Sequence, residues 1–146
     1  MTIIKMNENH VLQIAELEKL CFNDPWSENS IGSELENRLS LWLVATHEDH
    51  VIGYVGSQTV LGETDMMNIA VHPDWRERGI GTELILALIQ ELTEQGSHSL
   101  MLEVRVSNEP AKSLYTKMGF EAVGIRKNYY RNPREDALIL RKEWDL

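Results

Sequence analysis

Residues 67–82 constrain the fold more than any other stretch, because an apolar strand pattern runs through a glycine-containing loop into a helix start. Gly79 and Gly81 let the backbone approach a ligand closely. Consecutive N–H groups at the positive end of a helix cradle phosphate or pyrophosphate groups, and Arg76 and Arg78 add positive charge there. The alternative is a loop whose glycines serve only the turn into the helix.

Two common nucleotide-binding motifs are missing from this segment. The third glycine of the dinucleotide fingerprint is absent, and no Gly-Lys-Ser/Thr follows as it would in a P-loop. The strands that precede the segment also do not form a βαβ unit. We therefore expect a pyrophosphate ligand without an NAD-type or ATP-type pocket.

The order of predicted elements indicates an α/β (α+β) fold with a mixed sheet rather than a repeated βαβ winding. Before the glycine loop, the patterns predict strands over residues 2–6, 40–47, 51–60 and 65–71, with helices over 10–20 and 27–38. After it, they predict helices over 82–95 and 108–118 and strands over 100–106, 120–126 and 137–144. The 146 residues predict a single domain, 1–146.

The charge is acidic and unevenly distributed. The chain has 14 Lys and Arg against 23 Asp and Glu, a net charge of −9, which argues against nucleic-acid binding through a basic surface. Residues 1–65 contain 11 of the acidic and 3 of the basic side chains. This half is either a solvated acidic face or a surface that attracts a cationic partner.

The remaining composition excludes several classes of site. Cys21 is the single cysteine, so an intramolecular disulfide and a Cys-rich zinc site are excluded, and its place in an apolar helix favours core packing. The five histidines lack ligand spacing, so we expect no metal. With no signal peptide pattern and no membrane-length apolar run, we expect a cytoplasmic protein without membrane contact. We also expect a monomer.

Glu103 stands inside the apolar strand over residues 100–104. Burial there would raise the pKa of its carboxyl group, as a general base near neutral pH requires. The alternative follows from strand alternation, which would direct Leu100, Leu102 and Val104 to the core and Glu103 to water.

Tyr115 follows the predicted N-cap Asn108 by seven residues, and it lies on an apolar helix face with Ala111 and Met118. It is either a core tyrosine or a phenol that protonates a thiolate leaving group. Tyr129 and Tyr130 point to opposite faces if the backbone is extended, and they either line a cleft or divide between core and surface. Trp26 precedes a helix start, where it packs as a staple or serves binding.

Two motifs together resemble the GNAT N-acetyltransferase superfamily over nearly the whole chain. They are Arg76-x-x-Gly79-x-Gly81 and Asn108-x-x-Ala111-x-x-Leu114-Tyr115-x-x-x-Gly119-Phe120. The resemblance implies a sheet of about seven strands with about four helices, which binds acetyl-CoA where two strands splay apart. It implies cofactor contacts from Ile69, Ala70 and Val71 along the pantetheine arm, from Arg76, Glu77, Arg78, Gly79, Ile80, Gly81 and Thr82 at the pyrophosphate, and from Asn108 and Tyr115.

Further residues resemble the members of this superfamily that acetylate the N-terminal alanine of the eighteenth small-subunit ribosomal protein. They include Pro25-Trp26-Ser27-Glu28, Leu102-Glu103-Val104-Arg105 and Arg126-x-Asn128-Tyr129-Tyr130. The resemblance implies Glu103 as general base, Tyr115 as general acid, and capture of a basic ribosomal protein N-terminus by Trp26, Tyr129 and Tyr130. It implies direct attack in a ternary complex, with backbone N–H groups near residues 69–71 stabilising the oxyanion.

Two alternatives of different classes stay open. One is an acetyltransferase for a small cationic amine, which the acidic half of the chain also suits. The other is a non-catalytic acetyl-CoA-binding module, since a fold does not determine a function.

Overall fold

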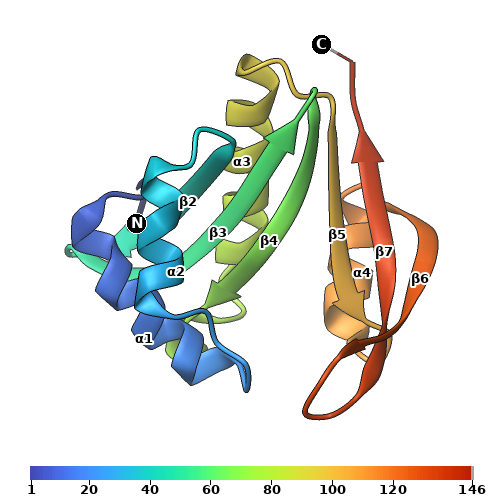
Figure 1. Cartoon of the computed structure of the whole chain (residues 1–146), viewed down its shortest axis with the longest axis horizontal. Helices are drawn as coiled ribbons and strands as arrows, with labels where there is room; N and C mark the ends of the chain where they lie inside the picture. Colours follow the sequence, from blue (N-terminus) through green and yellow to red (C-terminus); the bar gives the residue numbers. More distant parts are fainter. Residues whose placement is uncertain (146) are drawn as a thin grey trace.

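A seven-stranded mixed sheet runs through the molecule in the order β1-β2-β3-β4-β5-β7-β6, as seen in the computed structural model, which describes residues 1–145 (Figure 1). Those residues form the strands β1 (Thr2–Lys5), β2 (Ser40–His47), β3 (His50–Val60), β4 (Glu63–Val71), β5 (Ser99–Arg105), β6 (Glu121–Tyr130) and β7 (Glu135–Glu143). They also form the helices α1 (Val11–Cys21), α2 (Glu28–Ser33), α3 (Ile80–Glu94) and α4 (Glu109–Lys117). Short 3₁₀ turns occur at η1 (Glu8–His10), η2 (Glu34–Glu36) and η3 (Pro73–Trp75).

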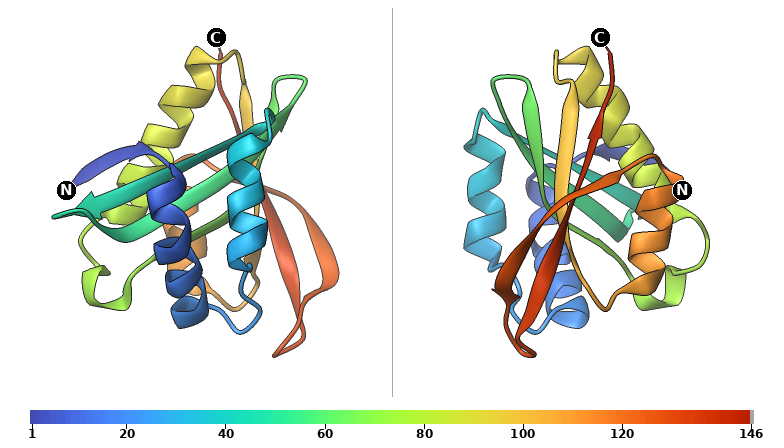
Figure 2. Two further views of the ribbon diagram at one scale, coloured as in Figure 1. Left: turned by 60° about the vertical axis from the view of Figure 1, so that its left-hand side comes forward. Right: turned by 90° about the vertical axis from the view of Figure 1, so that its right-hand side faces the viewer.

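Helices cover both faces of the sheet. Helices α1 and α2 lie on one side, and α3 and α4 lie on the other (Figure 2). Strand β2 shows how the two layers divide the side chains: Leu41 and Leu43 enter the core with α3, whereas Trp42 and Val44 enter the core with α1. A strand covered on both faces reads as a continuous apolar run, which is why residues 41–45 carry no polar side chain.

The structure confirms the mixed α/β sheet and the antiparallel run β2-β3-β4, while several element bounds differ from the predicted ones. Helix α3 begins at Ile80, two residues before the predicted start, and β6 continues to Tyr130. The predicted helix over 27–38 begins as expected, with the Ser27 hydroxyl accepting from the Ser30 N–H, but α2 ends at Ser33. There the buried Glu34 carboxylate accepts hydrogen bonds from Asn37, Ser40 and Gln58, and these bonds turn the chain into β2.

None of the helices within residues 1–145 is long and apolar enough to cross a membrane.

Gly56 and Trp42 make the closest fit inside the α1 layer. These two residues are register partners on β3 and β2, and the Trp42 ring lies flat over Gly56 and stacks on Tyr54 with centroids 5.7 Å apart. A Cβ atom at position 56 would lie 2.4 Å from the ring. The indole is buried and packs against Trp26 and Tyr54, so a shift of the ring would disturb both contacts.

We therefore predict that Gly56→Ala destabilises the protein by about 1–3 kcal/mol, the usual cost of overpacking a core. Chemical denaturation measures this free energy. The matched control is Gly32→Ala in α2, where the nearest atom to a new Cβ lies at an ordinary 3.7 Å. Since alanine favours the helix, this control should be neutral or stabilising by up to about 1 kcal/mol. Equal losses in the two variants would contradict the packing argument.

Candidate active site

Strands β4 and β5 separate after a short parallel ladder. In the described part of the chain they pair through three residue pairs, from Glu63↔Ser99 to Asp65↔Met101, and then diverge (Figure 1). A bulge marks the point of divergence, because Gly56 and Ser57 on β3 pair with Asn68 and Met66 on β4, which leaves Met67 as an extra residue. A cavity of about 650 Å³ opens between the two strands.

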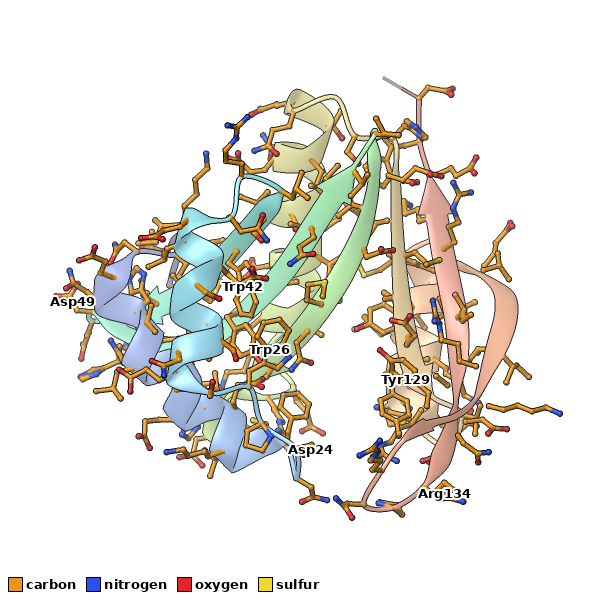
Figure 3. All side chains as sticks on the ribbon, in the orientation of Figure 1. Asp24, Trp26, Trp42, Asp49, Tyr129 and Arg134 are labelled. Carbon is orange, nitrogen blue, oxygen red and sulfur yellow. The ribbon has the colours of Figure 1, made fainter. Side chains whose placement is uncertain are left out.

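Both predicted catalytic side chains and all three predicted substrate-binding side chains line this cavity. Trp26 lies on the α1 side and Tyr129 lies across the gap on the β6 side (Figure 3). The predicted site residues that the cavity brings together are Trp26, Ile69, Glu103, Asn108, Tyr115, Tyr129 and Tyr130. Among residues 1–145, the lining excludes the other predicted cofactor contacts, which are Ala70, Val71 and residues 76–82.

Glu103 lies on the face of β5 that the cavity exposes. Leu100, Leu102 and Val104 are buried in the core as alternation requires, so Glu103 points the other way. This direction does not lead to bulk water, because the Glu103 side chain is only 17% exposed. Burial raises the pKa of its carboxyl group, while the Arg126 guanidinium, whose Nε lies 3.2 Å from Oε1, opposes that rise.

Tyr115 and Asn108 reach the cavity from helix α4. Tyr115 is 6% exposed and packs edge-on against Phe120, with ring centroids 5.5 Å apart. Burial raises the pKa of its phenol to about 12, so the hydroxyl stays protonated at neutral pH. Asn108 is the N-cap of α4, as predicted, and its Oδ1 accepts from the Ala111 N–H at 3.2 Å.

The glycine loop turns β4 into helix α3. Gly79 is the N-cap residue with a left-handed φ of 78°, a conformation that glycine adopts without strain. The Glu83 N–H makes an early helical bond to the Gly79 carbonyl, so the N–H groups of residues 80–82 fall among the first four of the helix, which lack helical partners. Those donors and the helix dipole form an anion site, although the Ile80 side chain itself is buried in the core.

Two arginines of this loop are held in place by their neighbours. The Arg76 Nε donates to the Val71 carbonyl at 3.1 Å, and its Nη2 contacts the Cys21 Sγ at 3.5 Å. Cys21 lines the cavity, so Arg76 connects the glycine loop with the cavity wall. The Arg78 guanidinium lies 4.7 Å from the centre of the Trp75 ring.

Tyr129 and Tyr130 both line the cavity, which an extended strand would not allow. The reason is Asn128, whose φ of 54° interrupts the strand, and the register with β7 shifts between Arg126 and Tyr130. The two tyrosine rings meet at 90° with centroids 5.0 Å apart. A left-handed asparagine therefore brings two adjacent aromatic side chains to one site.

Trp26 packs and lines the cavity at the same time. Its ring meets Trp42 edge-on with centroids 5.4 Å apart, as the staple interpretation predicts, and it also faces the cavity. Its backbone N–H donates to the Glu18 Oε1 at 2.7 Å. Sequence reasoning missed Glu18 as a site residue, although a carboxylate on the apolar face of α1 that Val11 and Ile14 define was a usable signal.

Arg105, which sequence reasoning also missed, fixes the segment between β6 and β7. Its guanidinium lies 4.4 Å from the centre of the Tyr130 ring and donates to the Arg131 and Pro133 carbonyls and to the Glu135 carboxylate, at 2.9–3.2 Å. Glu135 in turn accepts from the Ser107 N–H at 2.7 Å. One side chain of β5 thus holds the loop that follows the two tyrosines.

The two walls of the cavity meet at the end where their loops lie. The Asn23 Nδ2, between α1 and α2, donates to the Asn132 carbonyl, between β6 and β7, at 2.6 Å. Asn23 and Arg131 both line the cavity, so this bond bridges its two sides.

Sequence and structure comparisons identify the class of this protein. The sequence profile of the acetyltransferase (GNAT) family matches residues 11–120, and the chain belongs to that family. The resemblance of the motifs predicted two strands that splay apart, and in the structure β4 and β5 do so on either side of the cavity.

Individual relatives are more specific. The chain is 41% identical to a ribosomal protein bS18-alanine N-acetyltransferase of Salmonella typhimurium over 128 residues, which cover 86% of this chain and 85% of that protein. The crystal structure of the ribosomal-protein-S18-alanine N-acetyltransferase from Escherichia coli matches with a TM-score of 0.91 at 34% identity, and covers 99% of this chain and 94% of that one. Arabidopsis thaliana NAA60 in complex with acetyl-CoA shares the fold, with a TM-score of 0.88, 16% identity and 97% of each chain covered.

We predict that Arg105→Gln loosens the segment between β6 and β7 while the sheet stays intact. Each lost charge-assisted hydrogen bond is worth about 1.5–3 kcal/mol, so amide exchange over residues 131–135 should accelerate about tenfold or more. Hydrogen–deuterium exchange with mass spectrometry measures this change. Arg141→Gln, which removes the ion pairs of β7 with Glu63 and Glu143, is the matched control and should leave the loop unchanged. Unchanged exchange over 131–135 in the Arg105 variant would refute the assignment.

Proposed function

We propose that this protein transfers the acetyl group of acetyl-CoA to the N-terminal α-amine, that of alanine, of ribosomal protein bS18. The observation that carries the proposal is the cavity itself. The half-buried carboxylate of Glu103 on β5 and the buried phenol of Tyr115 on α4 both line it, together with the aromatic side chains of its two walls. The relatives named for this reaction cover most of the chain at 34–41% identity, which supports the choice of substrate.

The glycine loop and β4 are suited to hold acetyl-CoA. Its pyrophosphate would lie on the N–H groups of residues 80–82, with Arg76, Glu77, Arg78 and Gly79 shaping the loop. The His72 N–H bonds the Ile52 carbonyl on β3, and alternation along β4 therefore directs the N–H groups of Ile69 and Val71 to the open side of the strand. That edge would run beside the pantetheine arm. When bound, acetyl-CoA supplies an activated acyl group on a thioester.

Glu103 is the proposed general base. A protein α-amine has a pKa of about 7.7–8.0, so a large protonated fraction must lose its proton before attack. The raised pKa of Glu103 brings its basicity closer to that of the amine. Because Arg126 binds Oε1, the proton would go to Oε2, either directly or through a water molecule.

Tyr115 is the proposed acid for the departing sulfur. A phenol with a pKa of about 12 carries its proton at every pH at which the amine reacts. A thiol, with a pKa of about 8.5, is the stronger acid, so the first contribution of Tyr115 is a hydrogen bond to the sulfur as negative charge develops. Of residues 69–71, Val71 directs its N–H to the open side and would stabilise the oxyanion, because a fixed donor needs no reorganisation. The Ile69 N–H already donates to the Asn68 Oδ1, and the Ala70 N–H faces β3.

The two aromatic walls would determine how the peptide enters the cavity. Trp26 on one side and Tyr129 and Tyr130 on the other would enclose the first residue of the substrate. The acidic excess of residues 1–65, which include the Trp26 wall, suits a basic ribosomal protein N-terminus.

The proposal predicts one added acetyl group on a peptide that copies the bS18 N-terminus and begins with alanine. Mass spectrometry of the peptide after incubation with acetyl-CoA detects it, and the same peptide with a formylated N-terminus is the control that should stay unmodified. A polyamine in the same tube tests the small-amine alternative. Acetylation of the polyamine alone would reject the peptide substrate, and acetylation of neither would favour a binding module.

A second prediction concerns Glu103→Gln, which keeps the shape of the side chain and removes its basicity. General-base catalysis contributes about 10²–10⁴-fold, so kcat should fall by about that factor while the Kd for acetyl-CoA stays within about twofold. Steady-state kinetics and calorimetry measure the two quantities. Glu121→Gln, an exposed position on β6, is the matched control and should retain full turnover. Turnover that survives in the Glu103 variant at neutral pH would remove this residue from the mechanism.

A further inference from the structure

Glu18 is a buried carboxylate that the proposed chemistry does not use. It lies on α1 with an exposed fraction of 1%. Its carboxylate accepts hydrogen bonds from three separate parts of the chain. The Trp26 N–H, in the loop after α1, donates to Oε1 at 2.7 Å. The Asn68 Nδ2 on β4, at 2.7 Å, and the Tyr54 hydroxyl on β3 both donate to Oε2. Glu18 therefore joins the loop after α1 to the strands beneath it.

Two of these donors belong to opposite sides of the reaction. Trp26 lies in the wall proposed to receive the amine, and Asn68 lies on β4 directly after the bulge. The Asn68 Oδ1 also accepts from the Ile69 N–H at 3.1 Å, so the side chain is held at both ends of its amide. The Glu18 carboxylate thus fixes the distance between Trp26 and the start of the open edge of β4.

Packing alone does not require an acid at this position. Ile14 and Ala15, about one turn before it on α1, and the Tyr54 ring whose hydroxyl bonds it all belong to one buried hydrophobic cluster. Removing a carboxylate from water is costly, and burial raises the pKa of Glu18 to about 7 against the opposing effect of the Trp26 and Asn68 hydrogen bonds. An apolar side chain of similar volume would avoid that cost, so the acid serves geometry rather than stability.

We propose that Glu18 is a positioning residue for acetyl transfer, which holds the Trp26 wall at a fixed distance from Asn68 and Ile69 on β4. The inference rests on the proposed function, because it assigns Trp26 to the amine side and β4 to the acyl side. Glu18 itself touches no reacting atom.

A second buried acid provides an unusually close control. Glu34 is 7% exposed and also accepts three hydrogen bonds, here all from side chains, those of Asn37, Ser40 and Gln58. All four residues lie in η2, β2, β3 and their connections, and none of them lines the cavity in the described part of the chain. Both acids are thus buried and accept three hydrogen bonds, but they connect different parts of the fold.

The test is Glu18→Gln compared with Glu34→Gln. A glutamine offers one oxygen to three donors, so one donor must face its NH₂ group and the link between Trp26 and Asn68 is broken. Loss of one such charge-assisted bond should raise the peptide KM or lower kcat so that kcat/KM for the peptide falls about tenfold. The Kd for acetyl-CoA should stay within about threefold, and Glu34→Gln should change neither constant more than about twofold while it lowers stability.

A readout that needs no substrate accompanies the kinetics. In ¹H–¹⁵N NMR, the Trp26 amide should move upfield in Glu18→Gln and exchange about tenfold faster, since it loses a carboxylate acceptor. If Glu18→Gln does not fold, the double variant Glu18→Met, Tyr54→Phe replaces the carboxylate and one of its three donors with apolar groups of similar size. It should fold and show the same tenfold loss in kcat/KM for the peptide.

The possible outcomes separate the positioning role of Glu18 from the proposed function. An active wild-type protein with unchanged peptide constants in a folded Glu18 variant would overturn the positioning role alone. Equal kinetic losses in the Glu18 and Glu34 variants would also overturn it, because the effect would then be one of stability. If the wild-type protein acetylates no peptide while Glu18→Gln shows the expected Trp26 amide shift, the proposed function and the positioning role that rests on it are both rejected, and the hydrogen-bond link itself is established.

Discussion

The candidate active site depends on the short parallel ladder between β4 and β5. Strands β4 and β5 share three residue pairs and then part, and every group that lines the cavity follows from that separation. A parallel pair that continued to Val71 and Arg105 would fill the space with backbone hydrogen bonds. The bulge at Met67 and the antiparallel neighbours β3 and β7 let each strand keep one paired edge, so the cost of opening the sheet is confined to the two facing edges.

The two walls of the cavity are built by the same physical device. On the β4 side, the Glu18 carboxylate collects donors from the Trp26 loop and from two strands. On the β5 side, the Arg105 guanidinium collects acceptors from the loop after Tyr130. A charged side chain with several convergent partners fixes a loop in direction as well as distance, which apolar contacts do not. An acidic side chain, Glu18, thus fixes the wall on the β4 side, and a basic one, Arg105, fixes the wall on the β5 side.

The chain order of the elements, several helix starts near their caps and the glycine loop were predictable because local patterns determine them, whereas the insertion of β7 between β5 and β6 was not. Alternation correctly placed Leu100, Leu102 and Val104 in the core, but it could not show that the other face of β5 borders a cavity instead of water. That depends on where β4 goes, some forty residues earlier in the chain. The pairing of Tyr129 and Tyr130 on one side was also out of reach, since it follows from the left-handed Asn128. Glu18 and Arg105 were missed for a related reason, because their partners lie up to 50 residues away in sequence.

The bond between Asn23 and Asn132 has a consequence for the topology of a substrate. It ties the two loops together at one end of the cavity, so a polypeptide can pass beneath that end only as a free terminus that is threaded through. A continuous chain, with residues on both sides of the point of entry, could be laid between the loops only after the bond had opened. For the proposed peptide substrate, this bond would therefore favour the entry of a chain end over that of a chain middle from that side.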